Sequence, residues 1–264
     1  MKAGRFDLLL AKDVGEAVKA LQTEDAKAAS GFQSLGPMLN LRLAQPRLIV
    51  NLTRIPELSA VEETADMVVY GAAVTHAAIE DGRVPDAAGG ALARVASGIA
   101  YRAVRNRGTI GGSLAHADPA ADWPTALTAL GAKVRVAGPR GVRRAPVAGF
   151  VRGAFAPALG EGEVIVAVEV PKASAAARFG YVKFCRKVGE FAEAMAAAFH
   201  DPDTGVTRLA VGATEAPPQL LEGDFADLDA RLATLDLGAD PVRQRLHRTA
   251  ARRAMAEATT GIAA

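Results

Sequence analysis

A glycine-rich segment at residues 31–36 has the composition of a backbone cradle for phosphate groups. It reads Gly-Phe-Gln-Ser-Leu-Gly and lies between an expected strand over 26–30 and an expected helix that starts at Pro37. Glycines permit a tight turn that points several N–H groups at one centre, and a helix N-terminus favours negative charge. Ser34 adds a hydroxyl donor. An ordinary strand-to-helix turn has the same composition, so both interpretations stay open on this segment alone.

Three common catalytic or nucleotide motifs do not fit the chain. Pro37 stands where a P-loop carries its lysine, which excludes a P-loop ATPase. The glycine spacing is not the GxGxxG of a Rossmann NAD site. No serine lies in a GxSxG turn, so a hydrolase triad is unsupported as well.

A second glycine segment, Thr-Ile-Gly-Gly-Ser at residues 109–113, repeats the chemistry of the first. Its Gly-Gly pair lets the backbone approach a ligand without obstruction by a Cβ atom. Asp118 and Asp122 follow, and a carboxylate there can accept hydrogen bonds from sugar hydroxyls. Asp122 is also well suited to cap a helix that runs to Leu130, and one carboxylate can serve both purposes.

Histidine and cysteine positions argue against a metal site. None of His76, His116, His200 and His247 has metal-ligand spacing to another histidine or to Cys185. Each histidine is therefore expected at the surface or behind a site, with His116 nearest the second glycine segment. The single cysteine also excludes an internal disulfide and an iron–sulfur cluster held by this chain alone.

Composition limits the class of protein. The 264 residues are 50% hydrophobic and 23% charged, as in an ordered globular protein, and the net charge of +2 gives no sign of a nucleic-acid partner. No apolar run approaches the roughly 20 residues of a membrane span. The N-terminus carries no secretory signal, so we expect a cytoplasmic protein.

Hydrophobic periodicity predicts an α+β chain that positions the two glycine segments at strand and helix ends. The first fifty residues form a βαβ-like unit, with a capping box at Asp13 and Glu16. Pro171 begins a linker, and the last helix carries arginines on a solvated face. Further strands are expected over 47–52, 67–70, 133–137, 164–170, 179–185, 195–199 and 206–211, helices over 76–80, 85–96, 122–130 and 240–258, and a polar loop over 101–113.

Four motifs in order resemble those of a known family, the FAD-binding medium subunits of molybdenum hydroxylases such as carbon monoxide dehydrogenase and bacterial xanthine dehydrogenase-like enzymes. The first is Ser-Gly-Phe-Gln-Ser-Leu followed by Pro-Met, at 30–38. The second is Asn-Arg-Gly-Thr-Ile-Gly-Gly-Ser at 106–113, and the third is Ala-Asp-Pro-Ala-Ala-Asp at 117–122. The fourth is the Tyr-x-Lys-x-x-Arg-x-x-Gly-Glu-Phe-Ala run at 181–192.

The resemblance implies a two-subdomain PCMH-type FAD-binding domain over 1–173, with subdomains of about 1–55 and 56–173. A small C-terminal α+β domain like that of carbon monoxide dehydrogenase flavoproteins would follow over 174–264. Phe32 departs from the family, which has glycine there, so this residue needs either a negative φ or a strained backbone. Glu190 replaces the commoner aspartate.

The resemblance also implies the cofactor contacts. FAD would be held non-covalently, with its pyrophosphate on the two glycine segments, a sugar or ribityl hydroxyl on Asp122, and its ring near Phe191, whose alternative role is plain core packing. Lys183 would lie by the flavin, and Ile165 would supply a backbone contact. The implied set is Ser30, Gly31, Phe32, Gln33, Ser34, Leu35, Thr109, Ile110, Gly111, Gly112, Ser113, Asp122, Ile165, Lys183 and Phe191.

Family membership further implies an electron-transfer subunit without a catalytic residue or metal of its own. A large molybdenum-binding subunit would hold the molybdopterin, a small subunit the iron–sulfur clusters, and an external acceptor would take the electrons. Arg102, Arg105 and Arg107 would face an acidic partner or simply solvent. Two alternatives remain at this point: a stand-alone FAD oxidoreductase of the same fold, and a non-catalytic nucleotide-binding module.

Overall fold

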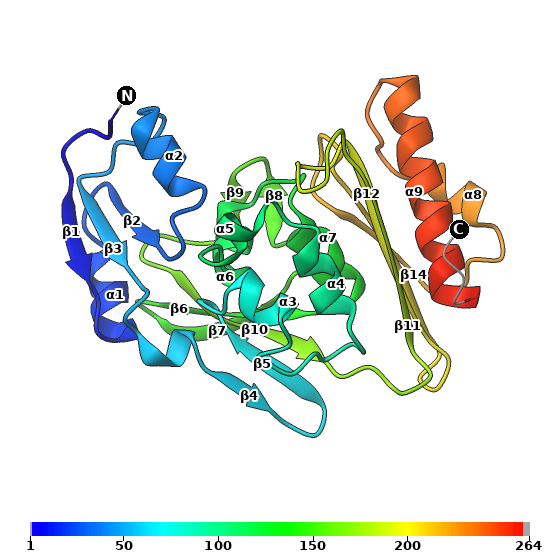
Figure 1. Cartoon of the computed structure of the whole chain (residues 1–264), viewed down its shortest axis with the longest axis horizontal. Coiled ribbons are helices and arrows are strands. Elements are labelled where there is room, and N and C mark those ends of the chain that lie inside the picture. Colours follow the sequence, from blue (N-terminus) through cyan, green and yellow to red (C-terminus); the bar gives the residue numbers. More distant parts are fainter. Residues whose placement is uncertain (1, 261–264) are drawn as a thin grey trace.

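Three β-sheets follow one another along the long axis of the molecule in the computed structural model (Figure 1), which describes residues 2–260. The outer ends of the two expected domains, residue 1 and residues 261–264, lie outside the described residues. The chain builds the sheets largely in sequence order. Helix and strand are mixed in every part, which confirms the predicted α+β class.

The N-terminal sheet is parallel, as the expected βαβ unit requires. Its order is β1-β3-β2, so the third strand lies between the first two. Asp13 accepts a hydrogen bond from the Glu16 N–H at 2.8 Å and caps the first helix as predicted, while the Glu16 carboxylate accepts from the Lys12 N–H at 2.7 Å and not from that of Asp13. The elements are β1 (Asp7–Leu10), α1 (Val14–Ala20), β2 (Ala26–Ala29), α2 (Leu35–Asn40) and β3 (Leu48–Asn51).

The central sheet is antiparallel and carries helices on one side. Its order is β4-β5-β10-β6-β7, and β10 is its longest strand. A two-stranded ribbon, β8 with β9, lies beside it. The elements are η1 (Pro56–Leu58), β4 (Val61–Glu63), β5 (Met67–Gly71), α3 (His76–Glu80), α4 (Ala91–Ser97), α5 (Arg102–Arg105), α6 (Ile110–His116), α7 (Asp122–Ala129), β6 (Lys133–Gly138), β7 (Gly141–Pro146), β8 (Val151–Gly153), β9 (Ala156–Pro157) and β10 (Val164–Pro171).

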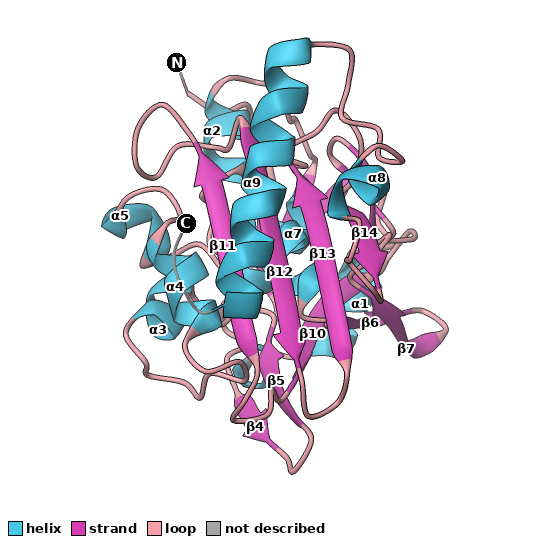
Figure 2. Cartoon of the chain, turned by 90° about the vertical axis from the view of Figure 1, so that its right-hand side faces the viewer, coloured by secondary structure: helices cyan, strands magenta, loops and turns pink. Residues whose placement is uncertain are grey.

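The C-terminal sheet is an antiparallel meander covered on both faces. Helix α9 crosses one face (Figure 2), while α7 of the central region packs on the other. The elements are β11 (Arg178–Phe184), β12 (Ala194–Asp201), β13 (Val206–Gly212), β14 (Gln219–Glu222), α8 (Leu228–Leu232) and α9 (Pro241–Thr260). Helix α7 is therefore buried along its whole length between two sheets.

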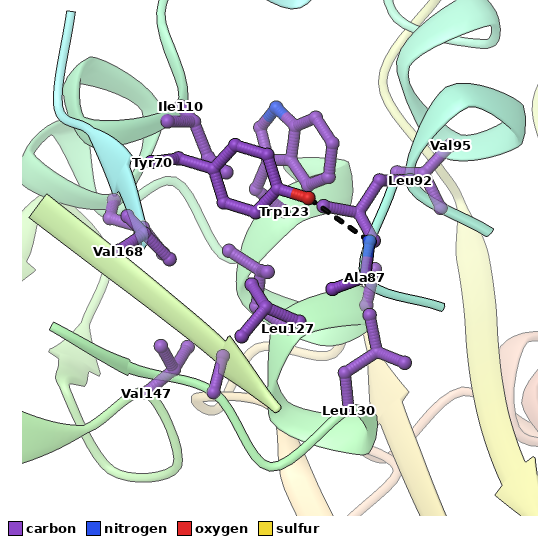
Figure 3. Packing of buried hydrophobic residues seen from close by; sticks show 14 of the residues in the cluster. Tyr70, Ala87, Leu92, Val95, Ile110, Trp123, Leu127, Leu130, Val147 and Val168 are labelled. Atoms are coloured by element: carbon purple, nitrogen blue, oxygen red, sulfur yellow. Dashed lines mark hydrogen bonds between the residues drawn. The ribbon is translucent and has the colours of Figure 1, made fainter. Parts of the chain in front are cut away.

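The main hydrophobic core fills the space between the central sheet and its helices (Figure 3). Tyr70 is fully buried there and its hydroxyl is satisfied, because it donates to the Pro85 carbonyl at 2.6 Å and accepts from the Ala87 N–H at 3.1 Å. Trp123 is the largest fully buried side chain. The same core continues into the C-terminal sheet through Tyr181, so this sheet and the central region share their packing.

Several predicted elements need correction. The helix expected over 85–96 begins only at Ala91, because Gly89 and Gly90 have left-handed φ angles of 61° and 94°. The loop expected over 101–113 contains α5 and the start of α6. Helix α2 begins at Leu35, so Pro37 is its third residue and not its first. Strands β4, β7, β8, β9 and β14, the 3-10 helix η1 and helix α8 were not predicted.

Candidate functional site

A cavity of about 880 Å³ opens between the N-terminal unit, the central sheet and the loop before β12. This volume is within the range of small-molecule and cofactor sites, about 300–1,000 Å³. The walls come from β2 and α2, at the left in Figure 1, and from α6, α7 and β10 in its middle. Every residue of the implied flavin set lines it except Ile110 and Lys183. Ile110 is fully buried in the main core.

The first glycine segment presents unused donors to this cavity. Phe32 has a φ of 60°, so the strained backbone is the outcome here, and not a negative φ. The backbone N–H groups of Phe32, Gln33 and Ser34 find no acceptor among residues 2–260. The Ser30 hydroxyl oxygen is buried and also has no hydrogen-bond partner in this range. Donors that the chain leaves free in a cavity wall are available to a ligand that carries acceptor oxygens.

Gly31 is required by the protein itself and not by the ligand. A Cβ atom on Gly31 would lie 2.0 Å from the Arg107 carbonyl oxygen and 3.0 Å from the Gly108 Cα. The first segment therefore rests directly on the backbone that leads into the second. The φ of Gly31 is not in the left-handed region, so close approach is the reason for glycine at this position.

The second glycine segment has its own amides satisfied, in contrast to the sequence interpretation. Thr109 caps α6 by accepting from the Gly112 N–H at 3.1 Å. The Ile110 and Gly111 N–H groups donate to the carbonyls of Val74 and Ala72, both at 3.0 Å.

Two glycines of this segment have different surroundings. A Cβ on Gly111 would lie 2.5 Å from the Ala72 Cβ, whereas Gly112 is exposed toward the cavity. The segment thus contributes glycine backbone without side chains and the Ser113 hydroxyl to the cavity wall, while the free amides belong to the first segment.

Asp122 joins the cavity to the C-terminal sheet. Its carboxylate is 2.9 and 3.1 Å from the Lys183 Nζ and accepts from the Tyr181 hydroxyl at 2.7 Å. Burial raises the pKa of Asp122, while Lys183 and Tyr181 act in the opposite direction. Burial and the neighbouring carboxylate together raise the pKa of Tyr181 well above its usual range.

Two expectations about this cluster change. Asp122 does not cap α7, since Ala121 occupies the N-cap position and the Asp122 carboxylate faces β11. Lys183 lies behind Asp122 and not in the cavity wall, and it also donates to the Gly98 carbonyl at 3.3 Å.

Aromatic side chains surround the rest of the cavity. Phe191 lines it and is 59% exposed, which contradicts the alternative of plain core packing. Phe155 is 60% exposed and its ring lies 5.0 Å from that of His116, measured between centroids. Ile165 lies on β10 next to a register shift in its pairing with β6. Exposed aromatic rings and buried aliphatic groups together suit a large planar ligand.

His76 is a cavity residue that the sequence analysis did not assign to the site. It follows the cap residue Thr75, is 5% exposed and lines the cavity. The sequence predicted only that each histidine lies at the surface or behind a site, which does not place His76 in a cavity wall. Its neighbours are Gly108 and Trp123, more than 30 residues away in sequence. No local spacing could have signalled these contacts.

The arginines near residue 105 are largely engaged within the chain. Arg102 pairs with Asp81 and Glu80, at 2.6 and 2.9 Å. Arg105 donates to both carboxylate oxygens of Glu80 at 2.8 Å. Acidic side chains of α3 and the residue after it thus pair with both arginines, although Arg102 remains exposed, and the expectation of an acidic partner or plain solvent stays a prediction. Arg107 is exposed.

The donor set of the cavity fits FAD. Unsatisfied amides and a hydroxyl lie at the first segment, where phosphate oxygens would accept, while aromatic and aliphatic groups cover much of the remaining wall. No group of three His, Cys, Asp or Glu residues in the part of the chain that the structure describes could hold a metal ion. Within residues 2–260, no helix is long and apolar enough to cross a membrane.

Comparison with known proteins agrees with this chemistry. A sequence profile described as "FAD binding domain in molybdopterin dehydrogenase" matches residues 4–173. The carbon monoxide dehydrogenase medium chain of Hydrogenophaga pseudoflava is 37% identical over 220 residues, which are 82% of this chain and 77% of that protein. The 6-hydroxypseudooxynicotine dehydrogenase complex subunit alpha of Paenarthrobacter nicotinovorans is 34% identical over 248 residues, 90% of this chain and 83% of that one.

Solved structures have the same fold. A chain of carbon monoxide dehydrogenase from H. pseudoflava, in a form that lacks the Mo-pyranopterin moiety, superimposes with a TM-score of 0.89 at 32% identity and covers 98% of this chain and 99% of its own. A chain of quinoline 2-oxidoreductase from Pseudomonas putida 86 gives a TM-score of 0.86 at 31% identity, covering 99% of each chain.

Proposed function

The chain belongs to the family of FAD-binding domains of molybdopterin dehydrogenases, and from this premise we propose that it binds one FAD non-covalently in the large cavity and relays electrons through it. It is a FAD-binding oxidoreductase subunit of the molybdenum hydroxylase family. The electrons would enter from an iron–sulfur partner and leave to an external acceptor.

The observation that carries this proposal is the set of unused donors on the first glycine segment. The amides of Phe32, Gln33 and Ser34 and the buried Ser30 hydroxyl lack acceptors among the described residues, and they all border one cavity. Two phosphate groups would supply the missing acceptors. We therefore assign the pyrophosphate to this segment, with the second segment as the facing wall.

The remaining roles follow from position. Asp122 borders the cavity and would bind a sugar or ribityl hydroxyl with part of its carboxyl group, while Lys183 acts through Asp122 by pairing with it at 2.9 Å. Ile165 would offer its backbone. Phe191 would cover the flavin ring, because it is exposed at the cavity and stands free of the core.

The division of labour among subunits follows from what the chain contains. The flavin supplies the redox chemistry when it is bound, and this chain binds it, orients it and limits its contact with water. A single cysteine cannot hold an iron–sulfur cluster. We propose a small iron–sulfur subunit and a large molybdenum-binding subunit as partners, with residues 1–173 as the flavin domain and 174–264 as a second domain.

The test is expression of the chain alone and together with its two candidate partner subunits. The isolated chain should be yellow, release all its FAD on denaturation, and oxidise no substrate. The three chains together should elute as one complex and reduce a dye with substrate. Substrate oxidation by the isolated chain would favour a stand-alone oxidoreductase, and binding of nucleotides without a flavin spectrum would favour a plain nucleotide-binding module.

A further inference from the structure

The imidazole of His76 has a fixed tautomer in this structure. The indole Nε1–H of Trp123 donates to His76 Nδ1 at 3.1 Å, in the buried core beside α7. A ring nitrogen that accepts a hydrogen bond carries no hydrogen, so the neutral imidazole must carry its hydrogen on Nε2. Trp123 is itself fully buried and held by the packing around it (Figure 3), so the acceptor role of Nδ1 is imposed by the core.

The surroundings also keep the ring neutral. Burial, and to a smaller extent the positive charge of Arg105, lower the pKa of His76 to about 4. At neutral pH the side chain is therefore an uncharged donor through Nε2. The backbone N–H of His76 is separately satisfied by the Gly108 carbonyl at 2.9 Å.

The free Nε2–H lies where the two glycine segments meet. A Cβ on Gly108 would be 2.8 Å from His76 Nε2, and a Cβ on Gly31 would be 3.0 Å from the Gly108 Cα. His76 lines the cavity, and within residues 2–260 its Nε2 has no hydrogen-bond partner. His76 is 5% exposed as a residue, and it meets open space at this cavity.

We propose that His76 is a flavin-positioning residue whose Nε2–H donates a hydrogen bond to a pyrophosphate oxygen of the bound FAD. This inference rests on the proposed function and adds a third donor group to it. The unused amides of 32–34 and the Ser30 hydroxyl border the same cavity, and the oxygens of a pyrophosphate would supply acceptors for all of them. Trp123 fixes this tautomer of His76, because without the indole N–H the imidazole hydrogen could move from Nε2 to Nδ1.

The experiment compares FAD with riboflavin, which has no phosphate, in the full-length apo-chain. We expect His76→Phe, which keeps a planar ring but no donor, to weaken FAD binding by about 10- to 100-fold, as for a lost hydrogen bond to a charged group. Riboflavin affinity should change less than about threefold, since it lacks the acceptor. His76→Gln, which restores a donor, should recover most of the FAD affinity.

Two outcomes would overturn the inference. One is an equal loss of FAD and riboflavin affinity in His76→Phe, which would indicate a merely structural role. The other is an unchanged FAD affinity in the same variant. Failure of the wild-type chain to bind FAD would instead overturn the proposed function and, with it, this inference.

A measurement on the wild-type chain covers the case in which His76→Phe does not fold. The ¹⁵N resonance of His76 Nε2 should report a protonated nitrogen without FAD and shift downfield in its proton dimension when FAD is added. The Trp123→Phe variant should lose part of this single-tautomer signal. A His76 Nε2 resonance that does not shift when FAD is added would contradict the proposal.

Discussion

The two glycine segments are alike in sequence and different in use. The first leaves three consecutive amides without acceptors and holds Phe32 at a φ of 60°. The amides of the second donate hydrogen bonds to the carbonyls of Ala72 and Val74 and to the hydroxyl of its own cap residue Thr109. The glycines differ as well, since Gly31 makes room for backbone of the neighbouring segment, whereas Gly112 opens onto the cavity.

Glycine content alone therefore does not identify a phosphate cradle. A glycine-rich run offers amides, but tertiary hydrogen bonds decide whether any remain for a ligand. In this chain we propose that the first run binds the ligand and that the second supports it, and the contact between Gly31 and the 107–108 backbone links the two. Four predictions follow from that division, in order of expected effect.

The largest effect is expected at the contact between the segments. In Gly31→Val, the new side chain would meet the Arg107 carbonyl, which is backbone and cannot move aside. We expect at least about a 100-fold loss of FAD affinity by calorimetry and a loss of about 1–3 kcal/mol in unfolding free energy. The control is Gly36→Ala, whose Cβ would meet only Phe32 Cβ at 3.9 Å. Near wild-type affinity of Gly31→Val would contradict the contact.

The second prediction concerns how the unfolding free energy depends on pH. The group involved is His76, which packs beside Gly108 just before the second segment. His76 has a pKa of about 4 in the folded chain against 6.5 ordinarily, so the unfolded state binds more protons between these values. Its contribution of about 3 kcal/mol is present above pH 6.5 and is lost as the pH falls toward 4.

Urea unfolding of the apo-chain at several pH values measures this loss. The control is His76→Gln, which should show a flatter pH profile, while the similar contribution of His247 stays in both proteins. Parallel profiles for the two proteins would show that His76 is not the group that titrates.

The third prediction separates the two adjacent glycines of α6. Gly111→Ala would press on Ala72 at 2.5 Å and should cost about 1–3 kcal/mol of stability in urea unfolding. Gly112→Ala would approach only the Thr109 hydroxyl, at 2.7 Å, and should cost about 1 kcal/mol by disturbing that cap. An equal cost at both positions would indicate that the second segment is not held by Ala72.

The smallest effect is expected at Phe32. Phe32→Gly relieves a left-handed backbone that costs about 1–2 kcal/mol for other residues, but it also removes a partly buried ring. The two changes nearly cancel, so unfolding free energy should stay within about 1 kcal/mol of wild type. FAD affinity should change less than threefold by calorimetry. A tenfold loss would mean that the ring itself contacts the flavin.

The sequence by itself determined the class of ligand and much of the secondary structure. Local signals were sufficient for Asp13, which caps its helix as predicted, because a cap depends on neighbours within three residues. The motif order also identified the family, since the matched stretch of residues 4–173 contains three of the four motifs. These features depend on short spacings or on residue identity, which a sequence contains directly.

Only the tertiary structure decided which polar groups remain for a ligand. Asp122 was expected to cap its own helix, but packing of α7 against the C-terminal sheet turns the carboxylate to Lys183, 61 residues away. His76 reaches the cavity because Trp123, 47 residues on, holds its ring. A hydrogen bond can be satisfied by any suitable group that folding brings near, so the choice of partner is a property of the packed chain and not of its local pattern.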